Sequence, residues 1–207
     1  TGVSISERLE DRPGHILVDQ SGTGFRKCDV TTDDLLIIDE DCELVEDAPN
    51  GARRKAPVNV VIHTEYYNAN PLARACVHCH APFTQVFACK NMAIPPFTLQ
   101  AKLMGEVPCV FLDDRKLKEE YATSGKTVTV PSGLHTRDEV FYVMKKVAEE
   151  AVRLLAPRNA EMEKHGFGVN HFEHGIFVFG RNMGEAFDNL ERAEANARAL
   201  VLSSLLP

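Results

Sequence analysis

The sequence predicts a fold that combines strands and helices, in which helices cover a mixed or antiparallel sheet. Two features of the residue pattern support this class. Short apolar runs typical of strands occur near both ends of the chain, at 16–18 and within 169–180. Apolar residues recur at helical spacing over 140–154 and 186–200, as in helices that pack one face against a sheet.

The composition is that of a globular protein with one core. The chain has 207 residues, 44% of them hydrophobic and 26% charged, and no Pro/Gly/Ser-rich linker divides it, so we expect a single domain over 1–207. The net charge of -7 argues against a nucleic-acid surface, and no apolar run has the length of a membrane span. The six cysteines lack disulfide-framework spacing. We therefore expect a cytoplasmic protein that binds neither nucleic acid nor membrane.

The N-terminal part has the pattern of a hairpin, a loop and a further strand. Alternation over 3–9 and the apolar run 16–18 flank turn residues at 11–14, and another apolar run covers 35–38. Segment 57–70 is ambiguous, because its β-branched residues favour a strand while its helical spacing and leading proline favour a helix.

The rest of the chain alternates between the two element types. Thr136 and Glu139 fit the cap and capping-box positions of a helix that ends before Pro157. We expect the other elements as strands over 75–78, 108–112 and 169–180, and as helices over 82–90 and 183–206.

His78 and His80 are the residues that most directly suggest a function. Residues i and i+2 of a strand point to the same face, so both imidazoles can hold one metal ion from one side. A third histidine from a distant segment would complete a three-ligand site with an open position, as in catalytic metal centres. His165, His171 and His174 compete for this role, and spacing alone does not choose among them.

Two cysteines near these histidines offer an alternative. Cys76 and Cys79 have the Cys-x-x-Cys spacing of half a structural zinc site, but no second pair closes it. We interpret Cys76 as a small buried strand residue and Cys79 as pointing with it, away from the metal face.

The order of motifs along the whole chain resembles the class II aldolase/adducin family. That family includes fuculose- and rhamnulose-phosphate aldolases and ribulose-phosphate 4-epimerase. The motifs are Ser21-Gly22 after a short strand, Thr31 to Leu35, His63 with Tyr66 and Tyr67 behind it, Val77 to His80, His174-Gly175 with Gly180, and Gly184 to Phe187.

The resemblance implies an α/β/α sandwich around a mostly antiparallel sheet. It also implies a site for zinc or another divalent transition metal at His78, His80 and His174, and a homotetramer with active sites at subunit interfaces. His174 is selected because Gly175 and Gly180 follow it. Family chains usually begin with a helix, so an N-terminal element is expected to be missing here. His63 is expected to be a structural histidine.

The chain departs from the family where its aldolases carry Ser-Ser-Glu. Pro57, Val58 and Asn59 occupy these positions, so no hydroxyl is offered to a substrate phosphate there. Asn59 holds the place of the catalytic glutamate but has no titratable proton. The backbone N–H groups of Ser21 and Gly22 could still bind an anion of the substrate.

Two further positions complete the expected site. Ser4 stands where the family has a substrate-binding amide. Glu106 is our candidate for the missing proton carrier, with Ala101 as the alternative match and a solvated loop charge as the simpler interpretation. Glu173 and Glu65 are further carboxylates that could move a proton.

These residues lead to three functional hypotheses. The first is a metal-dependent lyase that cleaves a C–C bond of a hydroxy-carbonyl substrate through a metal-stabilised enediolate. The second is a decarboxylase or epimerase of the same family, because decarboxylation needs the same electron sink without a strong base. The third is a non-catalytic, adducin-like scaffold, which the lost glutamate favours and the three histidines disfavour.

Overall fold

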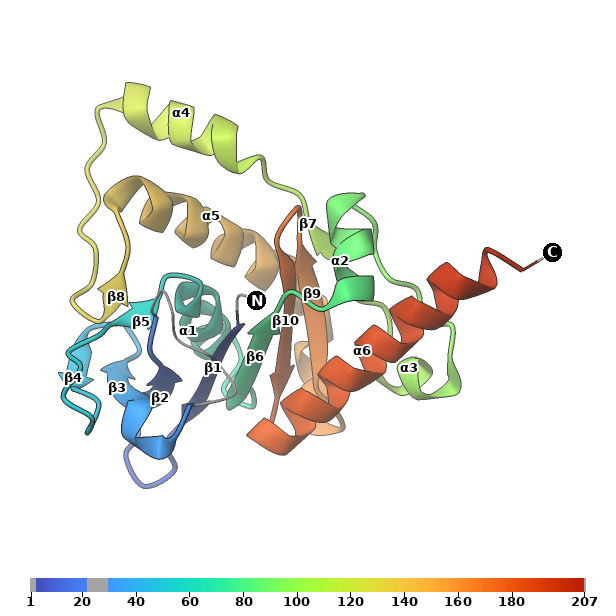
Figure 1. The fold of residues 1–207 in the computed structure, drawn as a ribbon, viewed down its shortest axis with the longest axis horizontal. Coiled ribbons are helices and arrows are strands. Elements are labelled where there is room, and N and C mark those ends of the chain that lie inside the picture. The colour runs from blue at the N-terminus through green and yellow to red at the C-terminus, as the bar shows by residue number, and fades with distance from the viewer. Residues whose placement is uncertain (1–2, 22–29, 207) are drawn as a thin grey trace.

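An eight-stranded sheet runs through the protein, and strands from both ends of the chain meet in it (Figure 1). The computed structural model describes residues 3–21 and 30–206. The sheet strands are β1 (Val3–Arg8), β2 (His15–Asp19), β3 (Leu35–Asp39), β4 (Leu44–Glu46), β6 (Ala75–Cys79), β7 (Cys109–Val110), β9 (Phe167–His171) and β10 (Gly175–Gly180).

The strand order is β4-β3-β2-β1-β6-β10-β9-β7. Neighbouring strands are antiparallel, except that β7 runs parallel to β9. Two short strands, β5 (Ala56–Pro57) and β8 (Leu134–His135), form a separate parallel pair. The mostly antiparallel sheet confirms the predicted fold class.

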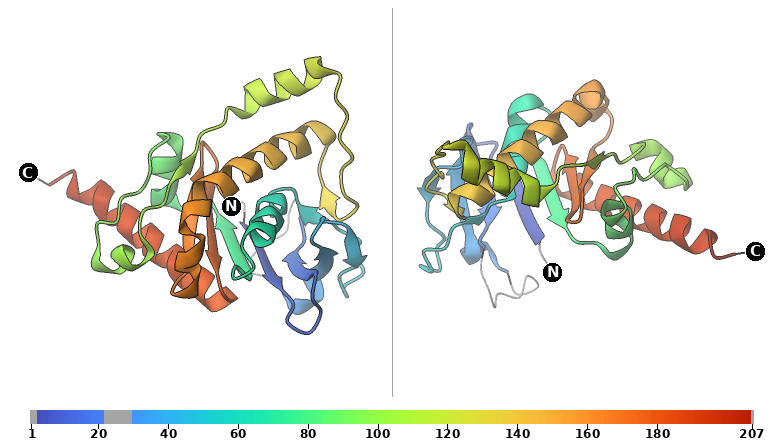
Figure 2. Two further views of the ribbon diagram at one scale, coloured as in Figure 1. Left: turned by 180° about the vertical axis from the view of Figure 1, so that it is seen from behind. Right: turned by 90° about the horizontal axis from the view of Figure 1, so that it is seen from above.

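Helices cover both faces of the sheet (Figures 1 and 2). One layer contains α1 and α5, with α4 outside α5, and the other contains α6 with α2 and α3 against it. None of the helices in the described ranges combines the length and apolar content of a membrane span. The helices are α1 (Val60–Ala69), α2 (Pro82–Cys89), α3 (Leu99–Met104), α4 (Asp114–Ser124), α5 (Asp138–Leu155) and α6 (Met183–Ser203), with 3₁₀ turns η2 (Thr32–Asp34) and η3 (Ala156–Glu163).

The ambiguous segment 57–70 folds as the end of β5 followed by helix α1. Its β-branched residues are explained by burial rather than by a strand, because Val60, Val61 and Ile62 all lie in the core. The expected cap at Thr136 is wrong: α5 begins one residue after Arg137, and the Thr136 hydroxyl bonds the Arg137 carbonyl instead. The sequence pattern did not indicate α3, α4 or the short strands β4, β5 and β8.

Helix α1 places a polar cluster against the middle of the sheet. The Ser6 hydroxyl lies 2.8 Å from Nδ1 of His63 and 2.8 Å from the Tyr67 hydroxyl, and Tyr67 donates to the Ser6 carbonyl at 3.0 Å. Ser4 lies 3.4 Å from Nε2 of His63. All four side chains are buried, so their hydrogen bonds offset the cost of removing them from water.

The burial of His63 makes the stability of the metal-free protein depend on pH. Burial lowers the pKa of His63 from 6.5 to about 3, so the folded state keeps it neutral while the unfolded state protonates below 6.5. The free energy of unfolding should therefore fall between pH 6.5 and 3, by up to about 1.4 kcal/mol per pH unit from this group. Urea unfolding of wild type and His63→Gln at several pH values measures this slope.

The variant should be less stable at pH 7 but lose stability less steeply on acidification. His165→Gln, which changes a half-buried histidine outside the polar cluster, should keep the wild-type slope. Equal slopes for wild type and His63→Gln would contradict the assignment.

Candidate metal centre

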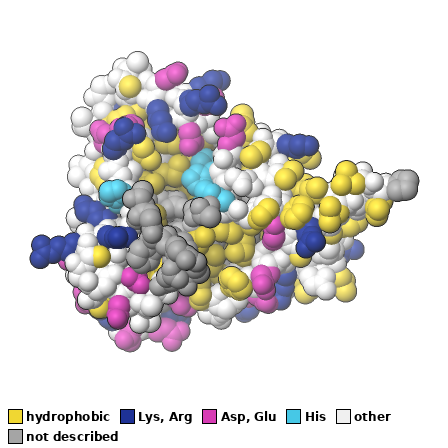
Figure 3. Space-filling model, viewed as in Figure 1, with side chains coloured by type: hydrophobic (Ala, Val, Ile, Leu, Met, Phe, Trp, Pro, Cys, Tyr) yellow, Lys and Arg dark blue, Asp and Glu magenta, His cyan; other side chains and the backbone are white. Residues whose placement is uncertain are grey.

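Three histidines from two distant parts of the chain meet at one end of the sheet. His78 lies near the end of β6, His80 follows β6, and His174 lies in the turn between β9 and β10. Pairing of β6 with β10 sets His78 opposite Phe177 and Cys79 opposite Ile176, so the turn reaches the end of β6. One ligand atom from each histidine lies within 4.8 Å of the others. Histidine side chains reach the surface near the middle of the face in Figure 3.

The hydrogen bond of His78 determines which nitrogen faces the centre. Its Nδ1 lies 2.9 Å from the carbonyl oxygen of Ile176, which only accepts, so Nδ1 carries the proton and Nε2 keeps its lone pair. Nε2 of His78 and Nε2 of His80 are both buried and have no hydrogen-bond partner among the described residues. A buried polar atom without a partner is costly, so this end of the sheet is built to receive a ligand.

The electrostatics also suit a cation. Burial, with added repulsion from neighbouring imidazoles, lowers the pKa of His174 to about 4 and that of His78 well below its usual 6.5. Burial lowers the pKa of His80 as well. All three rings are therefore neutral at pH 7, the form that binds metal. Nitrogens around a tetrahedral zinc ion lie about 3.3 Å apart, so small ring movements would bring the three into place.

Aromatic packing supports His78 from below. The Phe177 ring stacks on His78 with centroids 4.1 Å apart, and His63 meets the edge of Phe177 at 5.8 Å. His63 is thus fully buried one layer behind the histidine triad, in the structural position expected for it.

The expectation that Cys76 and Cys79 point together, away from the metal face, is wrong. Cys76 lies on the same face of β6 as His78, opposite Ser6 in the sheet, and only Cys79 points the other way. The reason is their separation of three residues, because strand side chains return to one face only at even separations.

Gly175 allows the turn to approach β6 closely. A Cβ atom at this position would lie 2.5 Å from the carbonyl oxygen of Cys79 and 2.8 Å from Cδ2 of His80. Helix α2 holds the same turn from the other side, because the Gln85 amide donates to the carbonyl of His174 at 3.2 Å. The position of His174 relative to His80 therefore depends on a glycine.

A fourth histidine and a carboxylate, which the sequence did not identify as a pair, adjoin the triad. His171 is buried and stacks on His174 with centroids 5.2 Å apart. Its Nε2 lies 3.4 Å from Oδ1 of Asp114, within ion-pair range but without the geometry of a hydrogen bond. Burial raises the pKa of Asp114, but the contact with His171, together with the nearby Lys118 and His174, outweighs it and the net shift is downward. A cavity of about 160 Å³ adjoins this pair, lined by Leu112, Asp113, Asp114, Arg115, Phe172, Glu173 and His174.

Parallel pairing of β7 with β9 explains how Asp114 arrives there. Val110 lies opposite His171 at the end of both strands, and the chain then runs on to Asp114 at the start of α4. Asp113 caps that helix by accepting from the N–H groups of Arg115 and Lys116. In the sequence, Asp113 and Asp114 stand between a short apolar strand and a helix, and this was the available signal for a functional carboxylate. The strand that pairs with β7 could not be known from the sequence.

Other expected site residues lie at the same end of the sheet. Ser4 pairs in register with His78, although its side chain is buried against His63. Ser21 follows β2 and donates its N–H to the carbonyl of Lys55 at 2.7 Å, so this group is engaged within the chain. Asn59 precedes α1, one turn from His63. Gly22 lies outside the described residues.

Glu106 is not brought to the triad of its own chain. Its carbonyl accepts a 2.7 Å hydrogen bond from Arg158, whose guanidinium lies over the ring of Phe167 at 4.6 Å. Phe167 begins β9 whereas His171 ends it, so Glu106 is held near the opposite end of that strand. Its side chain is exposed.

The close approach at Gly175 gives a direct test of the centre. Gly175→Ala should force the turn away from the Cys79 carbonyl and weaken zinc binding by about tenfold or more, because ligand geometry controls affinity. Titration with zinc by calorimetry measures the effect. Gly184→Ala is the matched control, since a Cβ there meets nothing closer than 3.4 Å. Equal zinc affinity in both variants would contradict this role for Gly175.

Comparison with known proteins agrees with this fold. The family model described as "Class II Aldolase and Adducin N-terminal domain" matches residues 1–201. The chain is 25% identical over 197 residues to a methylthioribulose-1-phosphate dehydratase of Stenotrophomonas maltophilia, covering 94% of this chain and 77% of the relative. It is 24% identical over 194 residues to an L-ribulose-5-phosphate 4-epimerase of Salmonella typhi, covering 92% and 71%.

Solved structures show the same fold. An L-fuculose 1-phosphate aldolase superposes with a TM-score of 0.69 at 18% identity, over 99% of this chain and 76% of that one. The L-fuculose-1-phosphate aldolase of Thermus thermophilus gives a TM-score of 0.64 at 22% identity, over 99% and 84%. The match of the family model across nearly the whole sequence shows that the chain belongs to the class II aldolase and adducin family.

Proposed function

We propose that the protein is a divalent-metal-dependent lyase that cleaves a C–C bond of a small hydroxy-carbonyl substrate. The observation that carries this proposal is the convergence of His78, His80 and His174, with two buried Nε2 atoms that have no partner among the described residues. A structural metal site would close all four positions with protein ligands, whereas three histidines leave one position for substrate. An adducin-like scaffold would gain nothing from such buried imidazoles.

We propose zinc as the metal, because three neutral imidazoles suit it, although other divalent transition metals bind the same ligands. A metal ion bound there would supply Lewis-acid stabilisation of negative charge on the oxygens of the substrate. The chain itself orients the ligands. The Ile176 carbonyl fixes the proton of His78 on Nδ1, and Phe177 holds the ring plane.

The residues around the triad suggest how protons are handled. Asn59 sits at the family's glutamate position, so it can donate a hydrogen bond to substrate but cannot take a proton. Among the described residues, Asp114 is the one acidic residue within ion-pair range of His171, the histidine that stacks on the triad. Asp114 also borders the same cavity as His174. Ser21, Gly22 and Ser4 stay the proposed substrate-binding residues.

Epimerisation or dehydration is the second candidate reaction. Both named relatives, a dehydratase and an epimerase, act on sugar phosphates by their names, and neither is an aldolase. Decarboxylation is a further alternative, since it needs no strong base. We retain the expectation of a cytoplasmic homotetramer with sites at subunit interfaces. Glu106 is held near the end of β9 opposite to His171, so it would reach a triad only in a neighbouring subunit.

Metal content and turnover test the proposal together. Untagged wild type should contain about one metal ion per chain, and His174→Ala should lose most of it because the triad becomes a pair. His165→Ala changes a histidine that precedes β9 and lies outside the triad, so this variant should keep wild-type metal content. Elemental analysis gives the metal, and assays for carbonyl products, CO₂ release and epimer exchange across a hydroxy-carbonyl panel give the reaction.

Different results separate the candidate functions. New carbonyl products identify the lyase, and epimer exchange or water loss identifies the second candidate. Protein that stays metal-free when zinc is offered would overturn the metal enzyme and favour the scaffold.

Asp114 provides a separate prediction. Asp114→Asn keeps the shape of the side chain but removes its ability to accept a proton, so turnover should fall by about a hundredfold if it is the base, while metal content stays unchanged. Asp113→Asn changes a neighbouring carboxylate that lines the same cavity but caps α4 and forms no ion pair with a histidine, so this variant should retain most activity. Full activity of Asp114→Asn would remove it from the mechanism.

A further inference from the structure

His171 is a buried histidine to which the proposed reaction gives no role. It ends β9, and strand alternation sets it on the same face as Phe167, whose ring meets that of Tyr66 in α1 at 6.2 Å. Its surface is 1% exposed, and neither Nδ1 nor Nε2 has a hydrogen-bond partner within the described ranges. A buried ring with two unsatisfied nitrogens is costly, which indicates a role beyond filling space.

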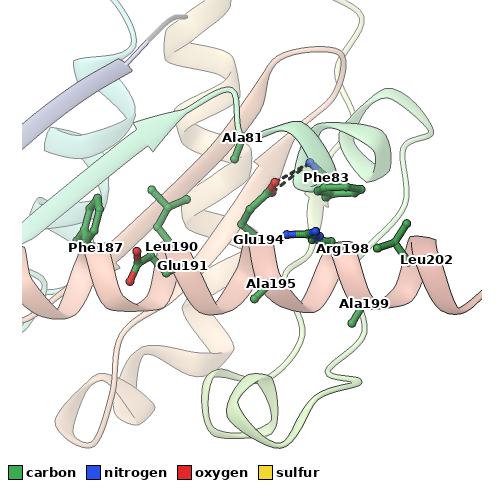
Figure 4. A pocket seen from close by; sticks show the side chains of 10 residues that line it. All are labelled: Ala81, Phe83, Phe187, Leu190, Glu191, Glu194, Ala195, Arg198, Ala199 and Leu202. Carbon is green, nitrogen blue, oxygen red and sulfur yellow. Dashed lines mark hydrogen bonds between the residues drawn. The ribbon is translucent and has the colours of Figure 1, made fainter. Parts of the chain in front are cut away.

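The ligands of the triad are supported in different ways. The loop that carries His80 runs into α2, where the N–H group of Phe83 donates to the Glu194 carboxylate of α6 at 2.9 Å (Figure 4). The N–H group of Thr84 donates to the same carboxylate at 2.9 Å. The ring of His174, in contrast, forms no hydrogen bond with any residue that the structure describes. Its orientation therefore depends on the rings around it.

The face of the His171 ring provides this support. The rings of His171 and His174 are stacked, with an interplanar angle of 23° and centroids 5.2 Å apart. The backbone fixes the two residues relative to each other, because the N–H group of His174 donates to the His171 carbonyl at 3.1 Å. Gly175 also lies opposite His171 in the ladder of β9 and β10. A stacked neighbour of this kind limits rotation of the His174 side chain.

The edge of the same ring faces Asp114. Nε2 of His171 lies 3.4 Å from Oδ1 of Asp114, and this oxygen is likewise buried without a hydrogen-bond partner among the described residues. A carboxylate only accepts, so the nitrogen that faces it carries the proton of the neutral ring. A small rotation of the Asp114 side chain would complete a hydrogen bond and satisfy both buried atoms. Because Asp114 borders the cavity beside His174, fixing one of its oxygens also determines where the other lies.

We infer that His171 is a positioning residue that holds two groups of the site at once. Its ring face sets the rotation of the ligand His174, and its Nε2 sets the carboxylate of Asp114 beside the cavity. The inference rests on the proposed function, because these neighbours are a metal ligand and the candidate proton carrier. His171 is not among the residues that line the cavity, so it acts through its two neighbours and not on the substrate.

Two substitutions separate the two contacts. His171→Phe keeps an aromatic ring against His174 but has no nitrogen to face Asp114. His171→Gln keeps an N–H donor near the position of Nε2 but has no ring. Zinc affinity, measured by calorimetry on metal-depleted protein, should be unchanged in His171→Phe. It should be about tenfold weaker in His171→Gln, as when other groups that orient metal ligands are removed.

The contact with Asp114 has a readout that needs no substrate. A water-soluble carbodiimide couples an amine to accessible carboxylates, and peptide mass spectrometry gives the labelled fraction. Asp114 should be labelled several-fold faster in His171→Phe and at the wild-type rate in His171→Gln. Asp113, which caps α4, is the internal reference and should keep its rate in both variants. His165→Phe and His165→Gln change a half-buried histidine outside the cluster, so both readouts should match wild type.

Turnover connects these contacts with the reaction. On a substrate found with the hydroxy-carbonyl panel, kcat should fall by about tenfold or more in His171→Phe and recover in zinc-saturated His171→Gln. Adding His171→Phe to Asp114→Asn should cause no further loss, because the group that His171 holds is already inactive.

The two variants must respond in opposite ways, because a general loss of packing would change both readouts in both of them. Wild-type zinc affinity in His171→Gln would overturn the support of His174. Wild-type labelling of Asp114 in His171→Phe would overturn the hold on the carboxylate. The expected zinc and labelling results without turnover of any compound would refute the proposed function and still support both contacts.

Discussion

The pairing of β6 with β10 is the constraint on which the candidate site depends. It sets the two histidine-bearing segments side by side although about a hundred residues separate them in the chain, and it fixes their relative height to one residue. The same pairing puts the Ile176 carbonyl where it orients His78 and puts Phe177 under the ring. A shift of the pairing by one residue would turn the strand side chains to the opposite face. The sheet register therefore determines which side chains can act as metal ligands.

The layer beneath the site is unusually polar for a core. Ser6, His63 and Tyr67 satisfy one another, and their hydrogen bonds specify how α1 sits on the sheet. A buried network of this kind becomes costly when it is only partly satisfied, so the arrangement leaves little freedom for α1 to shift. This network therefore gives rigid support to the aromatic ring that stacks on a candidate metal ligand.

Local pattern and family resemblance together predicted the main elements and the triad, but not the surroundings of the triad. Alternation along β6 indicated that His78 and His80 share a face, whereas the choice of His174 over His171 came from the resemblance alone. Asp114 could not be placed, because only the parallel pairing of β7 with β9 carries it to His171. Glu106 was expected at the site because the pairing of β7 with β9 was unknown. In the structure, the contact of its backbone with Arg158 holds it elsewhere.

The carboxylate of Glu194 joins two parts of the molecule that the sequence keeps far apart. It belongs to α6, yet it holds the first N–H groups of α2, which begins two residues after His80. The loop that carries one ligand is thus anchored to a helix on the outer layer. Strain applied to α6 would be transmitted to the first turn of α2, so the affinity of the centre for its ion need not be a property of the inner residues alone. Substitutions in α6 are therefore expected to affect metal affinity, although this helix lies away from the metal ligands.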